Sequence, residues 1–373
     1  MSTTTTNYLS AIKNMNEEFQ SYIIIVFIFI ILGIFIGYMI YLTKLNANEV
    51  SYMNNLYSNV DGNIKPINRS DPDCSGNLYD YYIKTAYNAC SGGSYKNDFV
   101  DIGNLKAIIK QGVRCLDFEI YSVNNQPVVA TSTVNDYFVK ETFNSVSFAS
   151  VMDTIKNYAF AGGTCPNPTD PIIVHLRIKS NNQPMYSNLA NILKSYDSIM
   201  LGKEYSYENS GLNLGSTPLL SFKNKVILIV DKINNAFLEN PDFLEYVNLT
   251  SNSAFMRAYD YYNVKNNPDT QELTEYNKRN MTIVLPDGGT NPTNPSGVLC
   301  RNYGCQMIAM RYQLVDNFLV ENALFFDASS YAFALKPADL RYQPVTIPDP
   351  TPQNPAYSYA TRNSSTDYYS FNY

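Results

Sequence analysis

The stretch PIIVHLRI, residues 171–178, has the strongest strand pattern in the chain and contains its only histidine. Aliphatic and β-branched residues fill it almost without a break, which is typical of a parallel strand buried on both faces. Side chains two positions apart in a strand point to the same side. His175 and Arg177 are therefore predicted to face the same buried space.

Similar runs recur between about Asp71 and Arg341, and helical patterns lie between several of them. The predicted strands are residues 83–87, 114–121, 127–131, 171–178, 225–231, 254–261, 281–285 and 306–312. Eight strands alternating with helices predict an α/β fold of the (β/α)₈ TIM-barrel type. A doubly wound open sheet also fits the alternation, but no glycine-rich phosphate loop follows the first strand.

An apolar segment precedes this body. YIIIVFIFIILGIFIGYMIYL, Tyr22–Leu42, contains no charged residue, and its length is enough to cross about 30 Å of hydrocarbon at 1.5 Å per residue. Large side chains continue to its end, where a signal peptide would have small residues for cleavage. The segment is therefore predicted to be an uncleaved, single-pass transmembrane helix.

The chain is thus expected to divide into five parts. These are an N-terminal tail (1–21), the transmembrane helix (22–42), a linker (43–73), a barrel (74–345) and a Pro/Tyr-rich extended tail (346–373). Six cysteines permit disulfides on an oxidising side of the membrane, and Cys115 is expected to pack outward against a helix. A net charge of −6 without a Lys/Arg-rich run argues against nucleic acid as a partner.

Two parts of the barrel sequence resemble a known family. YNACSGGSYKNDFVDIGNLKAIIKQGVRCLDFEIY, with PIIVHLRI behind it, resembles the X half of the phosphoinositide-specific phospholipase C barrel, here 74–235. MTIVLPDGG and the later LKPADLR resemble its Y half, here 254–345. The resemblance implies a phospholipase C-type barrel. In that family two histidines and a calcium ion cleave the phosphodiester of an inositol lipid.

The resemblance also implies which positions carried the chemistry. The two catalytic histidines fall on Tyr87 and Thr131. A phenol with a pKa near 10, or a hydroxyl, does not exchange protons near neutral pH as an imidazole does. The resemblance therefore predicts a pseudoenzyme without catalytic residues.

The calcium ligands implied by the resemblance fall on Asn88, Asp117, Glu119 and Arg177. A cation at the fourth position would repel Ca²⁺, which needs six to eight oxygen ligands. We therefore expect no metal, and we expect the guanidinium of Arg177 to form an ion pair with Asp117 and Glu119. His175 is expected to be a hydrogen-bonded interior residue beside this pair.

The substrate-binding positions implied by the resemblance are also changed. Two lysines that hold ring phosphates fall on Ile229 and Asp231, and an arginine and a tyrosine that contact inositol fall on Ile283 and Leu285. None of these side chains attracts a phosphate. No substrate binding of the family's kind is therefore predicted.

The sequence thus predicts a non-catalytic, membrane-anchored structural or scaffolding protein without a cofactor. Its expected partners are the membrane, through one helix, and other structural proteins such as capsid or membrane proteins. The Asn- and Tyr-rich composition and the reduced domain content fit a large DNA virus, with the chain in a virion membrane such as the inner membrane. Two alternatives stay open: a phosphoinositide or inositol-phosphate binding module without turnover, and a divergent phosphodiesterase in which Arg177 replaces the metal.

Overall fold

The computed structural model describes residues 17–134, 138–344, 348–352, 354, 357 and 359–373. Its contacts divide the chain into two units, one ending at Arg341 and one comprising Tyr342–Tyr373, and each is described by itself. Most of the predicted N-terminal tail, residues 1–16, lies outside the described residues.

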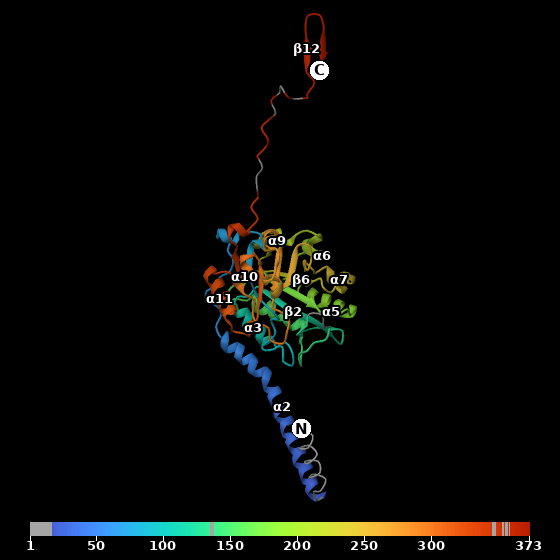
Figure 1. Cartoon of the computed structure of the whole chain (residues 1–373), viewed down its shortest axis with the longest axis vertical. Coiled ribbons are helices and arrows are strands. Elements are labelled where there is room, and N and C mark those ends of the chain that lie inside the picture. The colour runs from blue at the N-terminus through green and yellow to red at the C-terminus, as the bar shows by residue number, and fades with distance from the viewer. Residues whose placement is uncertain (1–16, 135–137, 345–347, 353, 355–356, 358) are drawn as a thin grey trace, which may run out of the picture. The chain divides into compact units, whose positions relative to one another are not determined.

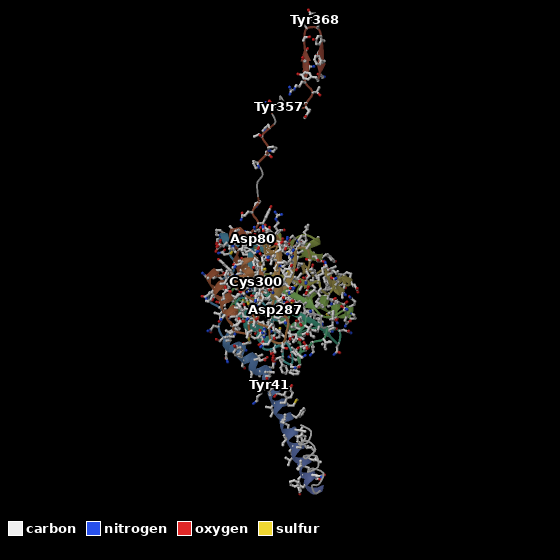
Figure 2. All side chains as sticks on the ribbon, viewed as in Figure 1. Tyr41, Asp80, Asp287, Cys300, Tyr357 and Tyr368 are labelled. Atoms are coloured by element: carbon white, nitrogen blue, oxygen red, sulfur yellow. The ribbon has the colours of Figure 1, made fainter. Side chains whose placement is uncertain are left out.

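Helix α2, Glu17–Leu56, contains the predicted span. It is long and apolar enough to cross a membrane, and its apolar side chains are exposed in the structure; Figure 2 shows Tyr41 projecting from it. The helix runs on through residues 43–56, which we had expected to be linker. This stretch contains no glycine or proline to end a helix, and Met53 is buried in the core.

Eight parallel strands form a nearly closed barrel, in the spatial order β7-β6-β5-β2-β1-β10-β9-β8. Their bounds are β1 Tyr81–Ala86, β2 Cys115–Val123, β5 Ile172–Ile178, β6 Val226–Asp231, β7 Leu249–Ser251, β8 Met256–Asp260, β9 Met281–Leu285 and β10 Met307–Met310. This arrangement confirms the predicted TIM-barrel fold.

One predicted barrel strand belongs elsewhere. Residues 127–131 fall mainly in β3, Gln126–Ala130, which pairs antiparallel with β2 and with β4, Val146–Ser147, outside the barrel. Asn124 and Asn125, in the turn between β2 and β3, have φ angles of 51° and 63°, as tight hairpin turns require. The missing barrel strand is β7, whose three residues are too few to show a period in the sequence.

Helices cover the outside of the barrel (Figure 1). They are α3 Ile102–Lys110, α4 Phe148–Thr154, α5 Gln183–Lys194, α6 Ser206–Ser210, α7 Pro241–Leu244, α8 Tyr261–Lys265, α9 Thr270–Asn277, α10 Gly297–Asn302 and α11 Asn317–Ser329. Several begin at side-chain caps: Asp101 accepts from the N–H of Gly103, and Asp316 accepts from that of Leu319. A short strand, β11 Phe333–Leu335, pairs antiparallel with β1.

The strands separate two apolar layers. The inner layer fills the barrel with side chains such as Ile173, Ile229 and Met307, and the outer layer packs the other strand face against the helices. Cys115 lies in the inner layer, with its Sγ 3.7 Å from the Sδ of Met307. The expectation that it packs outward was wrong, because residues 115 and 117 are two apart and face the same side. All six cysteines are buried free thiols.

The second unit contains an antiparallel hairpin, β12 Asn363–Ser365 and β13 Ser370–Asn372, at a position expected to be an extended tail. Tyr369 and Phe371 stack with centroids 6.1 Å apart, and Phe371 lies 5.9 Å from Tyr373. Figure 2 labels Tyr368 in the turn of this hairpin. Within the predicted tail, residues 346–347, 353, 355–356 and 358 lie outside the described part of the chain.

Candidate functional site

The candidate site lies where β2 and β5 approach the C-terminal mouth of the barrel, the end at which TIM barrels keep their sites. The two strands pair in register, with Asp117 opposite His175 and Glu119 opposite Arg177. All four side chains are buried. The alternation of the strands turns them inward together.

The guanidinium of Arg177 joins three side chains. Its Nε donates to Asp117 Oδ1 at 3.0 Å and its Nη2 to Asp117 Oδ2 at 2.7 Å, which is a bidentate pair. Its Nη1 donates to Glu119 Oε1 at 2.8 Å, and its Nη2 also donates to Asn88 Oδ1 at 2.9 Å. These contacts confirm the predicted ion pair, and they bring together all four positions at which the resemblance places metal ligands.

The second carboxylate is also held by β2 and the segment after β3. Glu119 Oε2 accepts from the hydroxyl of Tyr121 at 2.7 Å and from the backbone N–H of Ser132 at 2.9 Å. Both oxygens of Glu119 are therefore used. These hydrogen bonds offset the cost of burying the polar group.

His175 completes the network as an interior residue. Its Nδ1 is 2.7 Å from Asp117 Oδ1, and its Nε2 is 2.9 Å from the hydroxyl of Ser251 on β7. Because Asp117 is ionised, Nδ1 carries the proton and donates. Burial raises the pKa of Asp117, but the charge of Arg177 and the hydrogen bond from His175 outweigh it, and this pKa lies well below its usual value. Burial lowers the pKa of Arg177, but Asp117 holds it above its usual value.

An aromatic and cationic stack lies beside this network. The guanidinium of Arg177 lies 4.7 Å from the ring centre of Tyr87, and Tyr87 meets Tyr95 edge to face at 5.3 Å. The guanidinium of Arg311 lies 4.8 Å from the ring of Tyr95, and its Nε donates to the Tyr95 hydroxyl at 2.9 Å. Two cations and two rings thus pack against one another at the mouth.

Sequence reasoning missed Tyr95 and Arg311. Arg311 directly follows β10, two positions beyond the inward-facing Ala309, and this spacing was the available signal. Tyr95 lies in the loop after β1, where no period marks the direction of a side chain. Thr131, at the second predicted catalytic position, donates its hydroxyl to the backbone oxygen of Tyr95 at 3.0 Å.

Three of the four predicted substrate positions are apolar, and the fourth, Asp231, lines a small cavity together with Arg177 and Lys179. Ile229, Ile283 and Leu285 belong to the apolar layer inside the barrel. Asp231 accepts from the side-chain amide of Asn252 at 2.7 Å. Beside it, a cavity of about 140 Å³ at the mouth is also lined by Phe138.

Residues 74–232 match the family model for the X domain of phosphatidylinositol-specific phospholipase C. The match covers 159 of the 373 residues, and over them the chain is similar to that X domain. Two solved structures, PLC21 of L. pealei and PLC21 of S. officinalis, match with a TM-score of 0.58 at 17% identity, over 72% of this chain. The chain spans 38% of the length of either protein, and at this identity the likeness shows the fold alone.

A calcium-dependent phosphoinositol-specific phospholipase C from Pseudomonas sp. matches with a TM-score of 0.47 at 10% identity, over 71% of this chain and 97% of that protein. No curated protein matches the chain by sequence.

The barrel of this chain does not fit a calcium ion at the predicted positions. The oxygens of Asn88, Asp117 and Glu119 that would face the ion each accept a hydrogen bond from one guanidinium. That guanidinium already supplies the positive charge, and it occupies the space between the ligand atoms. A divalent ion would have to displace a buried cation from two carboxylates.

Proposed function

We propose that this chain is a membrane-anchored, non-catalytic protein whose phospholipase C-type barrel serves as a structural scaffold. The observation that carries the proposal is the guanidinium of Arg177, which bonds to Asn88, Asp117 and Glu119, the positions at which the resemblance places metal ligands. A fold does not bring its chemistry with it when the reacting groups have been replaced.

The groups needed for proton transfer support the same proposal. Burial raises the pKa of Tyr87 far above its usual value, so its phenol stays protonated near neutral pH. The hydroxyl of Thr131 donates a hydrogen bond to the backbone oxygen of Tyr95. The single imidazole, His175, is held by Asp117 and Ser251 in the interior. No general base or acid thus faces a substrate from these positions.

The two alternative functions have less support. A binding module for inositol phosphates needs a pocket, and ligand pockets usually measure about 300–1,000 Å³, whereas the cavity at the mouth measures about 140 Å³. A metal-independent phosphodiesterase would use Arg177 as the electrophile. That guanidinium is already bonded to two carboxylates and lies against the ring of Tyr87.

Hydrolysis of phosphatidylinositol and its phosphorylated forms tests the loss of catalysis. The full chain, reconstituted in vesicles containing each lipid, is compared with a Tyr87→Phe, Arg177→Ala double variant, with and without Ca²⁺. We expect the same background for both, since losing general acid–base catalysis alone removes about 10²- to 10⁴-fold in rate. Turnover of the parent clearly above the double variant would contradict the proposal.

The scaffolding role implies protein neighbours in the membrane. Cross-linking in the native membrane, followed by mass spectrometry, should recover the same structural proteins repeatedly at fixed residues of the barrel. A place in the membrane of a virion is part of the same proposal, and its test is detection of the chain in purified particles. Random cross-links proportional to protein abundance would argue against a scaffold.

A further inference from the structure

Helix α2 continues beyond the predicted span, which ends at Leu42, and lies against the barrel. Met53 is fully buried, and the hydroxyl of Tyr57, directly after the helix, donates to the backbone oxygen of Tyr312 at 2.7 Å. We call residues 43–57 the docked segment. Its contacts attach the span to the barrel.

Two carboxyl groups meet where the docked segment contacts the loop between β1 and α3. They belong to Glu49 on the helix and Asp98 in the loop. A Cβ atom placed on Gly93 would collide with Glu49 Oε1 and would lie 2.5 Å from Asp98 Oδ2, so both oxygens lie beside the same glycine. The two side chains share a hydrogen bond. Because an ionised carboxylate can only accept, one of the two acids carries a proton.

The surroundings of the two acids show which of them is protonated. Asp98 Oδ2 accepts from the backbone N–H of Ser94 at 2.7 Å, and Asp98 Oδ1 accepts from that of Phe99 at 2.9 Å. Such bonds favour the ionised form of a carboxyl group. Glu49 Oε2 is buried and has no hydrogen-bond partner within the described part of the chain, where a charge would be costly. Glu49 therefore carries the proton and donates to Asp98. Burial, together with the charge of Asp98, raises the pKa of Glu49 to about 8.

The other charged groups on the contacting elements have partners of their own. Asp101, at the start of α3, accepts from the side-chain amide of Asn46 at 3.0 Å. In the loop, Lys96 Nζ lies 2.9 Å from Glu141 Oε1, and on α3 the ammonium of Lys106 lies over an aromatic ring. These contacts leave the shared proton as the link between the two carboxyl groups.

We infer that this proton controls the attachment of α2 to the barrel: the docked segment stays bound while Glu49 is protonated and is released when both acids are ionised. The inference goes beyond the scaffold proposed above, because it makes the connection between span and barrel sensitive to pH. It does not depend on the loss of catalysis.

The sign of the pH dependence follows from the two states of Glu49. The docked segment binds the proton more tightly than the released segment, in which the pKa of Glu49 returns to its ordinary value of 4.5. Docking is therefore strongest at acidic pH, weakens as the pH rises from about 4.5 to about 8, and changes little above that. Between pH 6 and pH 9 the equilibrium constant for docking should fall roughly 100-fold.

Hydrogen–deuterium exchange of the full chain in nanodiscs, followed by mass spectrometry, tests this inference. Exchange rates at pH 6, 7.5 and 9 are divided by the intrinsic rate of the amides at each pH, which gives their protection. Protection of the docked segment should fall roughly 100-fold from pH 6 to pH 9, whereas protection of α5 should stay constant. Equal protection of the docked segment at pH 6 and pH 9 would overturn the inference.

Substitutions identify the acid that is responsible. Glu49→Gln keeps the shape of the side chain and can donate to Asp98 without titrating, so protection of the docked segment should no longer depend on pH. Glu275→Gln is the matched control, because Glu275 is an exposed glutamate paired with Lys278, and this variant should show the same fall as the parent.

A second variant covers the case in which Glu49→Gln does not fold. Asp98→Asn removes the neighbouring negative charge and should reduce the fall in protection between pH 6 and pH 9. A full fall in either Glu49→Gln or Asp98→Asn would overturn the inference. So would a docked segment that is unprotected at pH 6 in EDTA and protected by added Ca²⁺, because a metal ion would then join the two acids.

Discussion

Removal of the Arg177 side chain is the most direct perturbation of the candidate site. In Arg177→Ala the four hydrogen bonds from the guanidinium are lost. Asp117 and Glu119 then face each other in the barrel without a cation. Removing one partner from a buried ion pair typically costs about 3 to 5 kcal/mol. At about 2 to 4 °C per kcal/mol for a domain of this size, the melting temperature should fall by roughly 6 to 20 °C at neutral pH.

An exposed ion pair of similar geometry provides the control. Arg257 donates to both oxygens of Glu272, at 2.8 and 2.6 Å, but the carboxylate is half exposed. Arg257→Ala should therefore cost about 1 kcal/mol or less. Thermal unfolding of the full chain in detergent, followed by near-ultraviolet circular dichroism of its tyrosines, compares the two. An Arg177→Ala protein as stable as Arg257→Ala would refute the view that Arg177 is a structural counter-ion.

The same pair sets a pH dependence of known sign. The folded-state pKa of Asp117 lies well below its unfolded value, so its contribution to stability is full above the unfolded value and is lost as the pH falls through the folded one. In Arg177→Ala the cation that holds this pKa down is absent, and protonation relieves the repulsion between the two acids. The melting-temperature gap between parent and variant should therefore be smaller near about pH 4 than at neutral pH. A gap that widens on acidification would contradict this assignment.

Three further predictions concern single side chains. Arg177→Glu places an oxygen ligand at the fourth position, and its melting temperature should exceed that of Arg177→Ala only when millimolar Ca²⁺ is added. Equal stability of Arg177→Glu with and without Ca²⁺ would argue against a former metal site. Tyr87→Leu should lower the melting temperature more than Tyr87→Phe, because the ring, not the hydroxyl, contacts the guanidinium; equal losses would contradict this. Burial lowers the pKa of Lys336 to about 7, so the unfolded chain binds more protons above that pH and stability rises with pH. The gain in the free energy of unfolding from Lys336→Met should therefore be largest near neutral pH and should shrink as the pH rises. Calorimetry at several pH values across the alkaline range checks this.

Much of the barrel could be predicted because most of its strands are distinct apolar runs. Buried parallel strands such as β5 and β6 appear as unbroken apolar runs. The predictions failed where a barrel strand is very short, or where a strand outside the barrel has the same composition as one inside it. β3 has the composition of a barrel strand but forms a hairpin with β2, and β7 is too short to be recognised. The end of α2 could not be predicted either. Residues 43–56 pack one face against the barrel, and the sequence alone does not show which side chains that face contains.

At the site, the pair formed by Arg177 with Asp117 and Glu119 could be predicted because the resemblance placed these three residues around one metal position. The stack of Tyr87, Tyr95 and Arg311 could not. Tyr95 is brought to the mouth by a loop that has no period, and its partner Arg311 comes from a strand more than two hundred positions later. Such a contact depends on closure of the barrel, which joins β1 to β10.

The energetics of burial account for the presence of three oxygen-bearing side chains around Arg177, at positions where the resemblance places metal ligands. Asn88, Asp117 and Glu119 all bond to the guanidinium of Arg177, and all four side chains are buried. Once the cation is present, loss of either carboxylate leaves it partly unpaired in the interior, and loss of the cation leaves the carboxylates unpaired. The acids are therefore required for stability whether or not a metal ever binds. Their presence is not evidence of retained metal chemistry, and only a variant that lacks Arg177 can reveal what the remaining oxygens bind.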